Sequence, residues 1–341
     1  MSRAKALQSY ILIRLLLAPL MVWTIVTVVF LLLRATPGDP VDAILGNRAP
    51  EAAKASMREQ LGLNKPLIVQ YFDYLGNLLH LNLGASITSK GTSVWEIIQK
   101  HFPATAELAF YGMLVAIAVG VTLGIISASR PGSPVDVGGR LFGIITYSLP
   151  IFWVGMLFQL IFSVQLRLFP LGTRFPLSDP APEGWTGLYT VDSLLSGNFS
   201  QFFTALYYLA LPCLTLGILL SGIFERMVRV NLRQTLQSDY VEAARARGIP
   251  EKNILLSHAL KNALIPVITV LGLTFASLLG GAVLTEVTFS WPGLGKRLYE
   301  AIALRDYPTV QGLMIFFGVI VVVASMLIDI INAYIDPRIR Y

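Results

Sequence analysis

Charged side chains are scarce in this chain, and their scarcity excludes an ordinary soluble domain. Asp, Glu, Lys and Arg make up 13% of the 341 residues, whereas hydrophobic residues make up 55%. Soluble globular domains carry about 25% charged residues. The deficit and the long apolar runs together indicate an integral membrane protein. The pI of about 9.4 then favours basic loops at one membrane face over nucleic-acid binding.

Cysteine and histidine are also rare, and their scarcity argues against internal disulfides and against histidine-based active sites. Cys213 is the single cysteine, so no disulfide can form within the chain. The three histidines lie outside the long apolar stretches and none begins a His-Glu-x-x-His motif. The chain contains no Gly-x-Ser-x-Gly nucleophile motif. We therefore expect no catalytic residue, no metal site and no cofactor in this chain.

A nucleotide-binding loop is absent as well. The segment 291–297 has a superficial likeness to a phosphate-binding loop. However, Ser290 stands where the motif needs its first glycine, and Arg297 replaces the hydroxyl residue. We expect that this chain does not bind or hydrolyse ATP itself.

Six apolar stretches are long enough to cross a membrane, since a spanning helix needs ~20 mostly apolar residues. They cover residues 11–33, 105–129, 141–166, 205–228, 264–284 and 310–335. No charged residue lies at the centre of any stretch, whereas ion-coupled carriers place charges at that depth. The fold class predicted is therefore an all-α membrane protein with six transmembrane helices.

The basic residues predict the orientation, because short cytoplasmic loops are enriched in Lys and Arg. Arg167 and Arg174 are the only basic residues in the connection between the third and fourth stretches. The connection between the fourth and fifth stretches is richer in basic residues, namely Arg229, Arg233, Arg245, Arg247, Lys252 and Lys261. We expect this connection and both termini to be cytoplasmic, in a plasma (inner) membrane. Residues 1–33 then form the N-terminus and first helix, 34–104 an extracytoplasmic segment, and 105–341 a core with five transmembrane helices.

Small residues and polar caps predict local structure. Ala116, Gly120 and Gly124 form a stripe on the second stretch that lets another helix approach closely. Ser93 is placed to cap a short helix ahead of that stretch. Tryptophans fall in the outer segments, where interfacial anchors are expected; they are Trp95, Trp185 and Trp291.

The basic connection contains a short segment that has the pattern of a capped, water-facing helix over residues 239–248. Asp239 is a good N-cap and Glu242, three residues later, completes a capping box. Arg245 and Arg247 suit the negative end of the helix dipole. Gly248 supplies a left-handed C-terminal position, and a proline two residues later prevents continuation.

This helix is a candidate docking element. Its small Ala243 and Ala244 would allow its backbone to settle into a groove of another protein. The alternative is an amphipathic helix on the membrane surface, but the segment is poor in Leu, Phe and Trp.

The segment Glu242-Ala243-Ala244-x-x-x-Gly248, followed by Pro266, resembles the EAA motif of binding-protein-dependent ABC importer permeases. His258 and Lys261 depart from the commonest pattern, and the departure resembles the oligopeptide/dipeptide/nickel branch. Further similarities lie at Ala35–Pro40, Leu61–Leu67, Leu83–Ser86, Phe102–Thr105, Ser148–Trp153, Phe289–Gly295 and Arg305–Pro308. The ordered series most resembles the first of two paired permeases in that branch.

The resemblance implies a type I importer fold and a division of labour. A second homologous permease would complete the pathway, two ATP-binding subunits would hold ATP and Mg, and an extracytoplasmic solute-binding protein would deliver solute. The ATPase-docking residues implied are Asp239, Tyr240, Glu242, Ala243, Ala244, Arg245, Arg247 and Gly248. Di- and oligopeptides are the expected solutes, with nickel chelates and glutathione as alternatives within the family. A secondary carrier or channel is the alternative outside it.

Overall fold

The structure is a computed structural model that describes residues 3–35, 41, 45–46, 49–60, 62–89 and 91–335. Within these ranges the chain is helical, and its only β-pairing is an isolated bridge between Ala85 and Ser93. The all-helical prediction is confirmed for this part of the chain. The extreme termini, residues 36–40 of the Ala35–Pro40 segment and residue 61 of the Leu61–Leu67 segment lie outside the described residues.

Four helices are long and apolar enough to cross a membrane. They are α1 (Arg3–Ala35), α5 (Val94–Ser129), α9 (Phe199–Leu236) and α16 (Tyr307–Ile335). The second predicted stretch begins too late, because α5 starts at Val94 and continues through Pro103. Ser93 does cap a helix, since its Oγ accepts the Trp95 N–H at 3.2 Å, but that helix is α5 itself and not a separate short one.

The third and fifth predicted stretches are bent pairs of helices, so the described residues hold four spans, or up to six if each pair counts as one. The first pair joins α6 (Pro134–Ser148) to α7 (Ile151–Phe158) and the π-helical η1 (Gln159–Gln165), with a bend of 102°. Leu149 is extended there, at ψ 132°, because Pro150 disfavours helical geometry in the preceding residue. The apolar stretch predicted over 141–166 is therefore present as two helices joined by a sharp bend and not as one straight span.

The second pair joins the segment α11–η2–α12 to α13 with a bend of 52°. Its elements are α11 (Glu251–Asn253), η2 (Ile254–Ala259), α12 (Leu260–Ala263) and α13 (Ile265–Leu279). Gly281 follows α13 with φ +105°, a conformation that favours glycine. The chain then turns into α14 (Val283–Thr288), so the helix ends short of residue 284.

The centre of the molecule is the packing of α5 against α9. An added Cβ on Gly120 would come within 2.7 Å of the Phe224 Cβ, and one on Gly124 within 2.9 Å of the Glu225 carbonyl oxygen. Ala116 on the same stripe is fully buried. The predicted close approach along this stripe is confirmed, and α9 is the partner helix.

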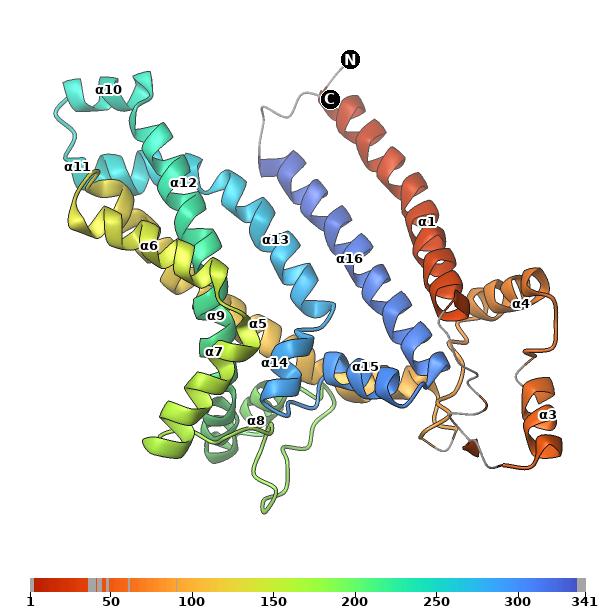
Figure 1. Ribbon diagram of the computed structural model, residues 1–341. Coiled ribbons are helices and arrows are strands. Elements are labelled where there is room, and N and C mark those ends of the chain that lie inside the picture. The colour runs from red at the N-terminus through yellow and green to blue at the C-terminus, as the bar shows by residue number, and fades with distance from the viewer. Residues whose placement is uncertain are drawn as a thin grey trace.

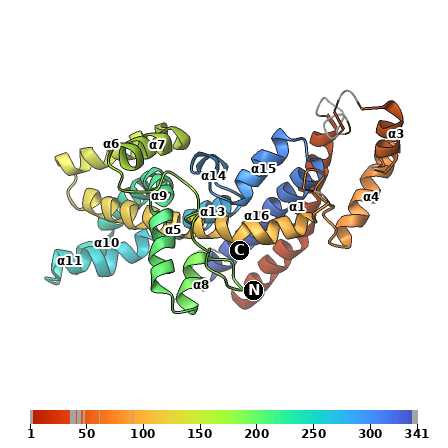
Figure 2. The same ribbon diagram turned by 90° about the horizontal axis from the view of Figure 1, so that it is seen from below.

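Shorter helices gather at the two ends of the long ones (Figures 1 and 2). At one end lies α10 (Asp239–Ala246), at the same level as the start of α1 but on the opposite side of the molecule. At the other end lie α8 (Tyr189–Leu195) and α15 (Leu294–Ala303), together with α3 (Glu51–Gln60) and α4 (Leu67–Leu79) beside the far end of α1. The docking candidate and the predicted extracytoplasmic segment thus occupy opposite ends of the structure.

Candidate functional site: the α10 helix and the opposite polar end

The helix predicted over residues 239–248 is present as α10, but its first residue differs from the prediction. Ser238 occupies the N-cap position with extended backbone, and Asp239 is the first helical residue. No side chain caps the free N–H groups. The capping box of Asp239 and Glu242 is therefore wrong. Both carboxylates instead lie in the first turn, where they suit the positive end of the helix dipole.

The C-terminal end of α10 is built as the sequence predicts. Gly248 has φ +76°. Its N–H donates to the Arg245 carbonyl at 2.9 Å, and the Ile249 N–H donates to the Ala244 carbonyl at 3.3 Å. This pair of bonds is a Schellman motif, which requires a left-handed residue at the position of Gly248. The helix consequently ends abruptly.

The two faces of α10 have different roles. Val241 and Ala244 are buried in a small core with Leu232 of α9 and Ile254 of η2. Ala244 is therefore small because this chain packs against it, which corrects the idea that it faces a partner's groove. Glu242, Ala243 and Arg247 are exposed. Their side chains form no hydrogen bond or ion pair with any described residue, so they are open to a partner, as is the exposed Asp239 at the start of the helix.

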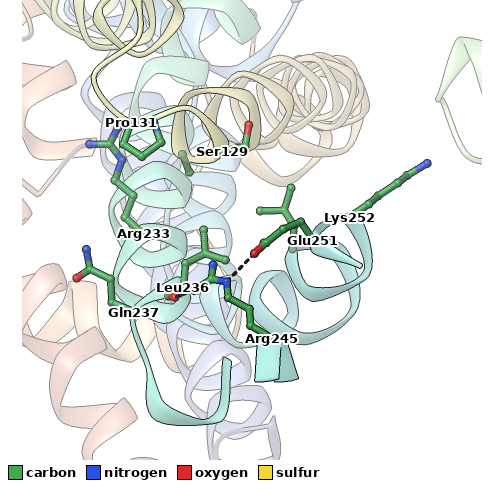
Figure 3. Close-up of a pocket in the computed structure, with 10 residues that line it drawn as sticks. Ser129, Pro131, Arg233, Leu236, Gln237, Arg245, Glu251 and Lys252 are labelled. Carbon is green, nitrogen blue, oxygen red and sulfur yellow. Dashed lines mark hydrogen bonds and ion pairs between the residues drawn. The ribbon is translucent and has the colours of Figure 1, made fainter. Parts of the chain in front are cut away.

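Two polar side chains fasten α10 to the segment that follows it, and Figure 3 shows the first of them, Arg245. Arg245 Nε donates to Glu251 Oε1 at 2.6 Å, and Arg245 also reaches the Leu236 carbonyl at 3.3 Å. The Tyr240 hydroxyl accepts from Asn262 Nδ2 at 2.8 Å and donates to the carbonyl of His258 at 3.3 Å. The helix is thus tied to α11, η2 and α12 as one unit.

A cavity of about 650 Å³ lies between this unit and the turn that joins α5 to α6 (Figure 3). Its polar lining includes Arg233, Gln237, Arg245, Glu251 and Lys252. Arg233 is already paired with Asp136 at 2.7 Å and Arg245 with Glu251. Two of the three cations that line the cavity are therefore already paired, and Lys252 is the third; the rest of the lining includes apolar residues such as Leu236 and Leu255.

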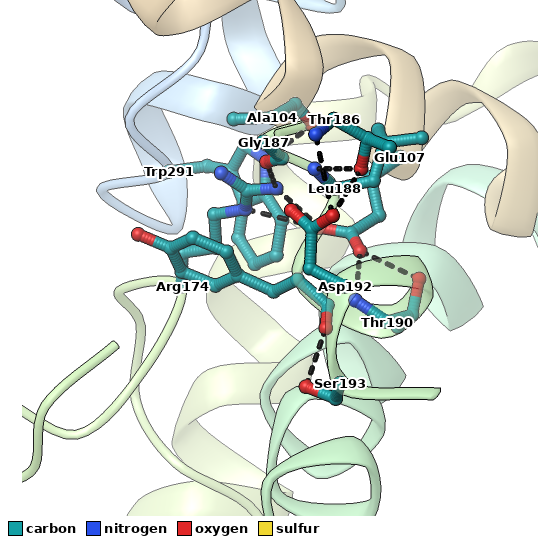
Figure 4. A network of polar contacts seen from close by, with 11 residues as sticks. Ala104, Glu107, Arg174, Thr186, Gly187, Leu188, Thr190, Asp192, Ser193 and Trp291 are labelled. Carbon is teal, nitrogen blue, oxygen red and sulfur yellow. Dashed lines mark hydrogen bonds and ion pairs between the residues drawn. The ribbon is translucent and has the colours of Figure 1, made fainter. Parts of the chain in front are cut away.

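The opposite end contains a buried ion pair that the sequence analysis did not identify (Figure 4). Arg174, from the loop after η1, donates to Glu107 of α5 at 2.7 Å, and both side chains are buried. Thr190 of α8 supplies its N–H and hydroxyl to the same carboxylate at 2.8 and 2.7 Å. The Arg174 guanidinium lies 3.7 Å from the centre of the Tyr189 ring. One carboxylate therefore joins α5, the outer loop and α8.

A second network joins α5 to the segment between α14 and α15. The Thr105 hydroxyl donates to Glu286 at 2.8 Å and accepts the Leu294 N–H at 2.8 Å. Trp291 is fully buried, and its Nε1 donates to the Ala104 carbonyl at 2.8 Å. Its prediction as an interfacial anchor is wrong, because it packs inside the chain. Burial raises the pKa of the Glu286 carboxyl above its ordinary value.

A third network joins the start of α16 to the loop before α5. Asp306 accepts hydrogen bonds from the Ser86 hydroxyl, from the Thr88 hydroxyl at 2.7 Å and from the Ile87 N–H at 3.2 Å. In the sequence, Leu83–Ser86 and Arg305–Pro308 are separate similarities, and Phe102–Thr105 and Phe289–Gly295 are two more. The structure brings them together in pairs, which their spacing in the sequence could not reveal.

Comparison with known proteins places this architecture in a family. Residues 120–341 match the family model described as binding-protein-dependent transport system inner membrane component. Residues 7–109 match the model of the N-terminal part of such components. The two matches together include the α5–α9 packing, α10 and the polar networks.

Named relatives are similar over nearly their whole length. A di/tripeptide transport system permease protein of Pseudomonas aeruginosa is 42% identical, over 92% of this chain and 93% of the relative. A probable D,D-dipeptide transport system permease protein of Escherichia coli is 41% identical over 94% of each. An oligopeptide transport system permease protein of Bacillus subtilis is 34% identical over 98% and 99%. On this evidence the chain belongs to the family of binding-protein-dependent transport system inner membrane components.

Proposed function

We propose that this chain is one permease subunit of an ATP-driven peptide importer and that α10 is the element through which ATPase subunits act on it. The membrane helices would form half of the pathway, and a second homologous permease would supply the other half. Peptides are the proposed solute class because relatives 42% and 34% identical are named for di/tripeptide and oligopeptide transport.

The observation that carries the coupling role is the contrast between the two faces of α10. The helix is fixed through Tyr240 and Arg245, closed by Gly248, and packed on one face. Its other face presents exposed Glu242, Ala243 and Arg247. An element that transmits force needs firm attachment on one side and an open contact surface on the other. A loop without these ties would absorb the movement instead.

The ATPases, with their ATP and Mg, would sit beneath α10 at the cytoplasmic face. The proposed orientation rests on the basic connection around α10 and on its position at the end of the molecule where α1 begins (Figure 1). An extracytoplasmic solute-binding protein would dock at the opposite end, above the three polar networks. In this arrangement both chain termini are cytoplasmic.

The docking proposal is tested by two substitutions. Gly248→Val forces a β-branched residue into left-handed geometry, which costs roughly 1–2 kcal/mol and should disturb the end of α10. Glu242→Lys reverses the charge of the exposed face. We expect both variants to insert into the membrane in normal amounts but to retain less ATPase subunit on co-purification from membranes.

Matched controls separate docking from folding. Gly248→Asn should bind ATPase normally, because asparagine tolerates the left-handed conformation. Lys252→Ala changes an exposed charge next to α10 but outside its open face, and should also bind normally. Unchanged ATPase recovery with both Gly248→Val and Glu242→Lys would contradict the proposal.

A further inference from the structure

The helix α4 is apolar but has no buried residue. Of its 13 residues, none is buried by the described part of the chain. Ile68 and Phe72 are 67% and 64% exposed, and Leu79 is 85% exposed. Since these residues recur at helical spacing, they form one stripe along the helix. An apolar stripe of this kind in a folded chain indicates a contact with something beyond it.

The helix is nevertheless held in a defined position against α1. The Tyr71 and Thr27 hydroxyls are 2.6 Å apart. The Phe30 ring lies 5.3 Å from the Tyr71 ring and 5.8 Å from the Tyr74 ring, measured between centroids. Tyr71 and Tyr74 therefore form the face of α4 that contacts α1. The stripe of Ile68, Phe72 and Leu79 is rotated away from that face and stays uncovered.

The polar residues of α4 occupy a separate face. Asp73 pairs with Lys65 at 2.6 Å, and Asn77 is exposed. On a helical wheel with 100° per residue, Asp73 and Asn77 lie on the side opposite the apolar stripe. A helix with one apolar and one polar long side is suited to a boundary between water and hydrocarbon.

The end of α4 gives a second, independent observation. Leu81 has φ +57°, a left-handed conformation that is unfavourable for leucine. The Asn82 N–H to Asn77 carbonyl bond of 2.9 Å and the Leu81 N–H to Leu78 carbonyl bond of 2.9 Å close the helix there. This position normally belongs to glycine or asparagine. The Leu81 side chain is 86% exposed, so these backbone bonds hold the conformation without packing of the side chain against the described chain.

We propose that α4 is a membrane-surface helix whose stripe of Ile68, Phe72 and Leu79, extended by Leu81, lies among the lipid acyl chains just below the headgroups. The helix that α4 packs against is itself a candidate membrane span, and Leu20 and Leu31 of that span are 52% and 58% exposed. The stripe carries no charge, as burial among acyl chains requires. In Figures 1 and 2, α4 projects outward from the end of α1 at the periphery of the molecule.

This placement assigns a mechanical role to the helix. Because α4 contacts α1 through aromatic rings and one hydroxyl pair, a helix held at the lipid surface would fix the depth and tilt of α1. An anchored α1 would then give α16, which packs along it, a fixed reference in the membrane.

The experiment compares spin labels on the two long sides of α4. Phe72→Cys and Asn77→Cys are each made in the full-length chain with Cys213→Ala, co-purified with its subunits and reconstituted in phosphatidylcholine–phosphatidylglycerol vesicles. Relaxation is measured with oxygen, which concentrates in acyl chains, and with chromium oxalate, which stays in water. The label at position 72 should show a several-fold higher ratio of oxygen to chromium accessibility than the label at position 77.

Ile68→Cys is a second stripe position if Phe72→Cys does not assemble, and it should behave like position 72. Equal accessibility ratios on the two sides would overturn the proposal. A stripe label that is open to chromium in vesicles and becomes protected only when the solute-binding protein is added would also overturn it, because the stripe would then be a protein-docking surface.

Discussion

Single buried carboxylates hold distant segments of this chain together, and their surroundings shift their pKa values in opposite directions. Glu286 lies among hydrogen-bond donors, but burial dominates and raises its pKa. Burial also acts to raise the pKa of Asp306, yet the hydrogen bonds from Ser86, Thr88 and the Ile87 N–H outweigh it. The pKa of Asp306 therefore lies below its ordinary value of 3.8. The charged form of Asp306 is the one that the fold requires.

The lowered pKa predicts how the contact with Asp306 depends on pH. Because the folded-state pKa is below the unfolded one, the stabilisation is complete above about 3.8 and is lost as the pH falls through the folded value. We expect Asp306→Asn to destabilise the segment 83–92 at neutral pH by about 1–3 kcal/mol. Hydrogen exchange of that segment measures this loss.

The pH series and a control complete the Asp306 experiment. The difference between wild type and Asp306→Asn should shrink as the solution is acidified below pH 3.8, the ordinary value for the carboxyl. Asp73→Asn, which breaks the exposed pair with Lys65, should change protection of segment 83–92 little. A difference for Asp306→Asn that stays constant down to the lowest pH would show that the negative charge is unimportant.

At the scale of elements, patterns local in sequence were predictable and contacts between segments were not. The end of α10 at Gly248 and the tight stripe of Gly120 and Gly124 follow from residue type and spacing alone. The inward position of Ala244 and the burial of Trp291 depend on which helices pack beside them. Periodicity does not determine that choice, because an alanine or a tryptophan fits either environment.

The bend after α6 was, in principle, readable from the sequence. Pro150 restricts the preceding residue and removes a backbone donor, but a proline in an apolar stretch can mark either a kink or a helix start, so the sequence alone did not fix the bend of 102°. The pairing of Leu83–Ser86 with Arg305–Pro308 could not be predicted in the same way. Its polar contacts join residues about 220 positions apart.

The stripe on α5 gives a prediction about two glycines. Gly124→Ala would place a methyl group 2.7 Å from the Val228 Cβ and 2.9 Å from a backbone oxygen of α9. Gly138→Ala, in α6, meets no atom within 4 Å. We expect Gly124→Ala to lower stability by about 1–3 kcal/mol, as overpacking does. Gly138→Ala should be neutral or slightly stabilising, because alanine favours helix.

Thermal unfolding of the purified variants in detergent checks this contrast. The midpoint should fall for Gly124→Ala and stay or rise for Gly138→Ala. Equal shifts in the two variants would mean that α5 and α9 do not approach as closely as the structure has them.

At the scale of the whole molecule, the positions of the buried charged residues distinguish transport driven by an ion gradient from transport driven by ATP. A carrier driven by an ion gradient needs ionisable groups near the middle of the membrane. In the described chain three buried ion pairs lie toward the ends of the long helices: Glu107 with Arg174 near α8, Asp136 with Arg233 near α10, and Glu225 with Arg229 in α9, beside Ser127 near the end of α5. The helix α10, which Tyr240 and Arg245 fix in place, would have no evident function in such a carrier, whereas in the proposed importer an external ATPase would push on it.

The proposed importer therefore predicts which energy source uptake follows. To drive a near-complete switch between two conformations, the ATPases must supply a bias of about 5.5 kcal/mol through α10. Dipeptide uptake by proteoliposomes that contain the complete transporter should need internal ATP and should persist when a protonophore collapses the proton gradient at constant ATP. Vesicles with Gly248→Val should lose ATP-driven uptake while Gly248→Asn retains it. Uptake that follows the proton gradient, or that proceeds without any ATPase subunit, would instead establish a carrier and leave α10 without the role proposed for it.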